Sequence, residues 1–181
     1  MDTKTKKLVQ AALMAALTAV GAFLRFPLGA MSFTLQDMFT VLAGVLLGWK
    51  WGAASQAVYV ALGLMGLPVF TQGGGLGYVL QPSFGFLLGI IPAASFTGLL
   101  AGNSGDRKRI VFACAAGLAV MYLVGVPYMG MILNLYMGKG LSVWTIVKTG
   151  MLVYLPGDAL KVAVVAAVAP ALCRGVRRAD A

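Results

Sequence analysis

The stretch FTQGGGLGYVLQPSFGFLLG, residues Phe70 to Gly89, is the feature around which we interpret the rest of the chain. It opens with a polar loop, here called the glycine loop (residues 70–81), in which four of the five positions 73–77 are glycine. Glycine tolerates positive φ and lets other groups approach closely. At membrane depth such backbone is tolerated only where it is buried in protein or lines a cavity. We therefore expect either a re-entrant structural plug or the lid of a binding site.

Apolar runs on both sides of this loop place the chain in a membrane. Hydrophobic residues make up 60% of its 181 residues, and charged residues only 10%. The hydrocarbon core is roughly 30 Å thick, so a spanning helix needs about 20 apolar residues. We predict an all-α membrane protein with six transmembrane helices in a single domain, residues 1–181. The predicted spans are 8–24, 38–48, 52–65, 83–101, 110–133 and 149–173, with loops at 25–36 and 134–148.

The distribution of cations predicts the orientation of these spans. Six spans put both termini on one side, and cytoplasmic loops carry an excess of Lys and Arg. With both termini in the cytoplasm, ten cations lie inside: Lys4, Lys6, Lys7, Lys50, Arg107, Lys108, Arg109, Arg174, Arg177 and Arg178. Only Arg25, Lys139 and Lys148 then lie outside, together with the uncharged glycine loop. The net charge of +9 is thus a topology signal, and we expect no nucleic-acid partner.

The residue inventory excludes most enzyme chemistry. The chain contains no histidine and no glutamate, which removes histidine-dependent triads and HExxH metal sites. The two cysteines, Cys114 and Cys173, have no metal-ligand spacing. The loop sequence GGGLGY lacks the GK[ST] ending of a phosphate-binding loop. We expect no enzymatic activity, no ATPase of its own, no metal and no cofactor.

Asp158 and Lys161 are the one ionisable pair well inside a predicted span. Charges at such depth are costly and mark functional sites by default. Their i, i+3 spacing puts both on one helix face. At 1.5 Å per residue they lie about 22 and 18 Å above the inner end of the span, on the side of the glycine loop. Either the two form a self-satisfied salt bridge, with Asp158 capping a half-helix, or they line a polar pocket under the loop.

The segment before the second span holds two more polar candidates. Thr34 and Asp37 match a capping box, [ST]xx[DE], so we interpret Asp37 as a helix cap rather than a ligand contact. Gln36 has no such structural role, and we expect its side chain to face a cavity.

Small residues in the first span provide a possible contact surface. Ala11, Ala15 and Ala19 are spaced by four, and Ala12 and Ala16 lie alongside. Such spacing lets another helix pack closely in lipid. The other helix could belong to a partner or to this chain.

Five blocks, taken together, resemble one known family. In order and spacing they resemble the BioY family, the substrate-binding S components of energy-coupling-factor (ECF) biotin transporters. The five blocks are SFTLQDMF, LAGVLLGWKWGA, GLMGLPVF, GGGLGYVLQPSFGFLLG and YLPGDALK. The resemblance runs from about residue 12 to 167. It implies a multi-pass protein of a bacterial or archaeal cytoplasmic membrane that captures biotin on the outer side. It also implies partners, namely an ECF coupling transmembrane subunit and a pair of ABC-type ATPases.

The resemblance also implies roles for individual residues. Asp158 and Lys161 match biotin contacts, and the ureido ring of biotin offers N–H donors to the carboxylate and a carbonyl to the ammonium. Gly74, Gly75 and Tyr78 match the lid and wall of the site. The carboxylate of biotin would accept hydrogen bonds from N–H groups of the glycine loop, from Tyr78 or from Gln81. The residues Ala11, Ala15 and Ala19 would contact the coupling subunit.

Two departures from the family pattern concern the binding site. The family often shows Gly-Pro-Thr-Gly-Gly-Tyr where this chain has Gln-Pro-Ser-Phe-Gly-Phe at 81–86, and usually an uncharged residue where Asp37 stands. These departures bear on which groups hold the carboxylate tail. The alternatives are an S component for another vitamin, such as thiamine or a lipoate-like acid, an intramembrane enzyme using Asp158, and a small ion-coupled exporter.

Overall fold

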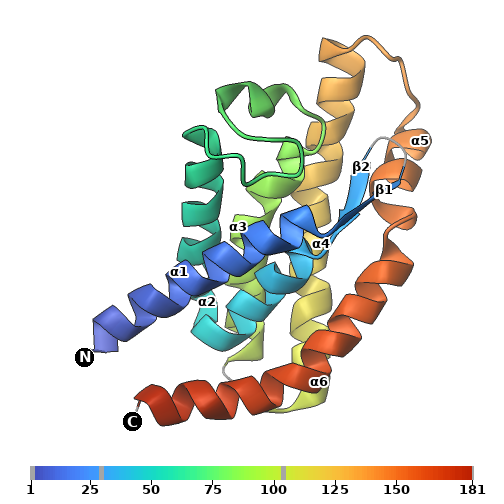
Figure 1. Ribbon diagram of the computed structural model, residues 1–181. Coiled ribbons are helices and arrows are strands. Elements are labelled where there is room, and N and C mark those ends of the chain that lie inside the picture. The colour runs from blue at the N-terminus through green and yellow to red at the C-terminus, as the bar shows by residue number, and fades with distance from the viewer. Residues whose placement is uncertain (1–2, 29–30, 103–104, 181) are drawn as a thin grey trace.

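The computed structural model describes residues 3–28, 31–102 and 105–180, and it is mostly helical (Figure 1). The long helices are α1 (Thr3–Phe23), α2 (Gln36–Leu64), α3 (Phe84–Ala101), α4 (Arg107–Met131) and α6 (Leu155–Asp180). The shorter elements are strands β1 (Arg25–Leu28) and β2 (Met31–Thr34), the 3-10 helix η1 (Leu76–Leu80), the π-helices η2 (Ile132–Tyr136) and η3 (Lys148–Leu152), and helix α5 (Val143–Val147).

Four helical segments are long and apolar enough to cross a membrane. They are Lys4–Phe23, Phe84–Ala101, Arg107–Tyr136 and Val143–Gly175. The chain is thus a multi-pass membrane protein. The Pro156-Gly157 pair predicts an interruption of the last span at these residues, but the irregular turns lie earlier, in η3 and at 153–154, before α6 begins.

Helix α2 is bent at Gly48, which has φ 76° and ψ −179°. A side chain is strained at that φ, so glycine allows the chain to reverse within what would otherwise be one helix. The parts on either side, 36–47 and 49–64, correspond to the two short apolar runs predicted from the sequence. Each part is shorter than a typical transmembrane helix, which needs about 20 residues. They cross closely at Gly52, where a Cβ would lie 3.0 Å from the Cα of Gly44.

The predicted loop 25–36 was wrong in part, because it contains an antiparallel hairpin of β1 and β2. Arg25 pairs with Thr34 and Leu28 with Met31 in its register. The fold is therefore not purely helical. Each strand has only four residues, too few to show the alternation by which a strand is recognised in a sequence.

The helices form one bundle with distinct ends. Helix α3 packs along both α2 and α4, and α6 closes the bundle against α2 and α4. The beginning of α1 and the end of α6 lie at one end of the bundle, and the glycine loop lies towards the other (Figure 1). This arrangement leaves a cavity between the glycine loop, the hairpin and the upper part of α6.

Candidate functional site

The cavity is built from segments that lie far apart in the sequence. Its walls come from β2, the first turn of α2, the glycine loop, α3, α4 and the segment 150–161. Most of the wall is apolar or aromatic. The polar side chains that line it are Thr34, Gln36, Asp37, Thr71, Gln72, Tyr78, Ser83, Tyr122, Tyr154, Asp158 and Lys161. A cavity that combines aromatic and apolar side chains with convergent polar groups is typical of a small-molecule site.

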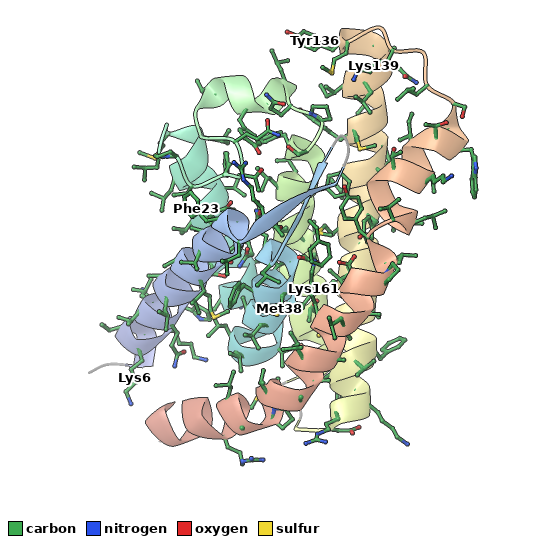
Figure 2. All side chains as sticks on the ribbon, turned by 45° about the vertical axis from the view of Figure 1, so that its right-hand side comes forward. Lys6, Phe23, Met38, Tyr136, Lys139 and Lys161 are labelled. Carbon is green, nitrogen blue, oxygen red and sulfur yellow. The ribbon has the colours of Figure 1, made fainter. Side chains whose placement is uncertain are left out.

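Three buried charges meet at the inner part of this cavity. The Nζ atom of Lys161 lies 2.8 Å from both carboxylate oxygens of Asp37 and 3.0 Å from Oδ1 of Asp158. Asp37 is 7% exposed, Asp158 4% and Lys161 6%. Two carboxylates and one ammonium give the group a formal charge of −1. Figure 2 shows the corresponding approach of α6, at Lys161, to the start of α2, at Met38.

Two aromatic residues hold this charged group in place. The hydroxyl of Tyr122, on α4, donates a hydrogen bond to Oδ2 of Asp158. The ring of Phe33, on β2, lies under the ammonium of Lys161, with 3.9 Å from Nζ to the ring centroid. Aromatic faces attract cations at such distances. Phe33 can approach because Gly157 has no side chain, and a Cβ there would lie 2.1 Å from the ring.

A chain of buried hydrogen bonds leads from the cavity to the first helix. Nε2 of Gln36 donates to the Tyr59 hydroxyl at 3.0 Å, and that hydroxyl donates to the carbonyl of Val69 at 3.0 Å. The single hydroxyl hydrogen of Thr40 is shared between two acceptors, the carbonyl of Gln36 at 3.0 Å and Oε1 of Gln56 at 3.2 Å. Gln56 then donates to Thr18 of α1 at 3.3 Å. Gln36 is thus fixed at the cavity wall, joined to both halves of α2 and to α1.

Comparison with known proteins agrees with this architecture. The model of the BioY family matches residues 1–178. The chain belongs to the BioY family. A probable biotin transporter BioY of Lysinibacillus sphaericus is 50% identical over 135 residues, which cover 74% of this chain and 69% of the relative. The biotin transporter BioY of Thermotoga maritima is 35% identical, over 91% of this chain and 94% of its own.

A solved structure extends the comparison to three dimensions. The crystal structure of the S-component for biotin from an ECF-type ABC transporter matches with a TM-score of 0.83 and 28% identity. The match covers 94% of this chain and 92% of that chain. The bundle is therefore the fold of an ECF S component, as the BioY resemblance of the sequence predicted.

The predicted site residues of this BioY chain fall into two sets. Asp158, Lys161, Tyr78 and Gln36 all line the one cavity described above. The glycines Gly74 and Gly75 and the exposed Gln81 lie in the same loop but are not among the lining residues. Gly74 packs against the carbonyl of Leu67, only 2.1 Å from where its Cβ would be. Its role in the structure is therefore a close backbone contact.

Tyr78 is held by the loop and by a row of aromatic rings. Its hydroxyl lies 2.8 Å from Oγ1 of Thr71 and accepts from Ser83 at 3.4 Å. Its ring centroid is 4.7 Å from that of Phe70 and 6.5 Å from that of Phe84. Of the aromatic residues Phe70, Tyr78, Phe84 and Phe86 in this stretch, Tyr78 and Phe86 line the cavity, whereas Phe70 and Phe84 are buried beside it.

The interpretation of Asp37 as a helix cap was wrong. Leu35 occupies the cap position of α2, without a side-chain cap, and the Asp37 carboxylate binds Lys161 instead. The sequence signal that could have revealed this was a second acid, besides Asp158, next to an apolar run. The roles of Tyr122 and Phe33 carried no such signal, because aromatic residues are common in the core of any helical bundle.

The alanine spacing in α1 serves internal packing in this structure. Ala11 and Ala15 are buried within the chain and belong to its hydrophobic core, and Ala19 is half-buried. The parallel pair Ala12 and Ala16 is exposed. The small side chains of Ala11 and Ala15 thus pack against the rest of this chain, and a contact of α1 with a partner stays a prediction.

Proposed function

We propose that the protein binds biotin with high affinity and serves its uptake across the cytoplasmic membrane as the S component of an ECF transporter. The observation that carries the proposal is the group of Asp37, Lys161 and Asp158, three buried charges that meet in one cavity. Buried carboxylates supply acceptors for two ureido N–H groups, and the ammonium supplies donors for the ureido carbonyl. The BioY relatives and the biotin S component support the same substrate.

The proposed topology has six membrane helices in one domain, with both termini in the cytoplasm. The two halves of α2 count as two helices, and α5 to α6 as one. The glycine loop then faces outwards and acts as the lid over biotin. The cation distribution and the placement of the glycine loop away from both termini support this orientation (Figure 1).

The proposed partners are an ECF coupling transmembrane subunit and a pair of ABC-type ATPases, which would supply the energy. The chain would need no cofactor and no ATPase activity of its own. Since Ala11 and Ala15 are buried, the coupling subunit would meet α1 on its exposed side, at Ala12 and Ala16, with Ala19 at the edge of the contact.

Calorimetric titration of the detergent-purified protein with biotin tests the substrate directly. We expect tight one-to-one binding of biotin without ATP, and no binding of thiamine or a lipoate-like acid. Binding of another vitamin but not of biotin would keep the fold and change the substrate. A wild-type protein that binds none of them would contradict the proposed function.

A further inference from the structure

The inner part of the cavity disfavours a carboxylate. Among the described residues that line the cavity, Lys161 is the only cation, and it already contacts two carboxylates. The group has a formal charge of −1, so an additional anion would be repelled there. A ligand that carries a carboxylate at one end and a cyclic urea at the other must therefore place its acid end near the mouth of the cavity.

Several donors near the mouth are already engaged. The N–H of Gly73 donates to the carbonyl of Phe70, and the N–H of Gly75 to that of Gly63. The hydroxyl of Tyr78 is paired with Thr71. These groups could bind an anion only after breaking a bond within the protein.

Arg25 is a cation attached to the cavity wall at two points. Its Nη1 donates a hydrogen bond to the carbonyl of Thr71, a residue of the wall. Its strand partner in the hairpin, Thr34, is also part of the wall. The guanidinium thus lies beside the mouth, between the hairpin and the glycine loop, and it is exposed.

We propose that Arg25 binds the carboxylate of the ligand at the mouth of the cavity. This inference rests on the proposed function, because biotin carries its carboxylate at the end opposite the ureido ring. A guanidinium has five N–H donors in a fork that matches a carboxylate. Within the described part of the chain, the only hydrogen bond of the Arg25 side chain is that to Thr71, so donors remain for the ligand.

The test compares biotin with biotinamide, in which an uncharged carboxamide replaces the carboxylate. Both ligands are titrated into the wild-type protein, Arg25→Gln and the control Lys139→Gln. Lys139 is an exposed cation at the top of the bundle, far from Lys161 (Figure 2). We expect Arg25→Gln to weaken biotin binding about tenfold or more, as loss of a hydrogen bond to a charged group does, and to weaken biotinamide binding much less, because the carboxamide oxygen is an uncharged acceptor. Lys139→Gln should change neither.

Each other outcome overturns the proposal in a distinguishable way. An equal loss of affinity for biotin and biotinamide would mean that Arg25 holds the hairpin against the glycine loop and does not contact the ligand. An unchanged affinity for both would place the carboxylate elsewhere. An equal loss in Lys139→Gln would indicate general attraction of anions. If the wild-type protein binds neither ligand, the proposed function itself fails, and this inference with it.

Discussion

The ammonium of Lys161 lies 2.8 Å from both carboxylate oxygens of Asp37, a residue 124 positions earlier in the chain. This contact joins the second turn of α6 to the first turn of α2. Asp158 binds the same ammonium from the other side, at 3.0 Å. Among the described residues, Lys161 therefore acts as the single counter-ion of two buried carboxylates.

Lys161→Met should strongly destabilise the protein. The substitution leaves Asp37 and Asp158 buried without a cation, and removing one partner of a buried ion pair costs about 3–5 kcal/mol. Thermal or denaturant unfolding in detergent measures the effect. The matched control is Lys148→Met, at an exposed position. Adding Asp37→Asn to Lys161→Met should restore part of the lost stability, and a single variant as stable as wild type would contradict the ion-pair geometry.

Asp158→Asn should weaken biotin binding by ~1–3 kcal/mol, the usual effect of leaving buried polar partners unpaired. Titration calorimetry of the purified variant measures it. Asp106→Asn is the control, because Asp106 caps α4 in an exposed position and asparagine caps helices equally well. Wild-type affinity in Asp158→Asn would remove this carboxylate from the site.

Gly157→Ala should reduce both stability and biotin affinity. The added Cβ would lie 2.1 Å from the ring of Phe33, so the ring must move away from Lys161. Overpacking of this kind typically costs about 1–3 kcal/mol. Gly175→Ala is the control on the same helix, because nothing lies within 4 Å of the Cβ it would add. If the two variants behave alike in unfolding and in titration, the packing of Phe33 is not important to the site.

The parts of the fold that follow local periodicity could be predicted from the sequence. The long apolar runs of α1, α3 and α4 and the break near Gly48 were predicted, because hydrophobic length and glycine content are local properties. The same holds for Asp158 and Lys161, whose cost in an apolar helix is visible without tertiary structure.

The rest depended on contacts between distant segments. Asp37 matched a local capping motif, and only the packing of α6 on α2 shows that its partner is Lys161. The spacing of Ala11 and Ala15 predicts close packing, but it contains no information on whether the other helix lies in the same chain. The position of Arg25 beside Thr71 required the hairpin, which is too short to detect from its sequence.

The proposed orientation predicts which cations face the outside of the cell. Cysteines placed at Lys139 and Lys50 are compared in a Cys114→Ala, Cys173→Ala background. Both native cysteines are buried, so these replacements remove little accessible surface. We expect a membrane-impermeant maleimide to label Lys139→Cys in intact cells and Lys50→Cys only after the membrane is opened, because Lys50 lies beside the Gly48 bend, on the side predicted to be cytoplasmic. The reverse pattern would invert the topology and place the glycine loop in the cytoplasm, where it could not capture biotin from outside.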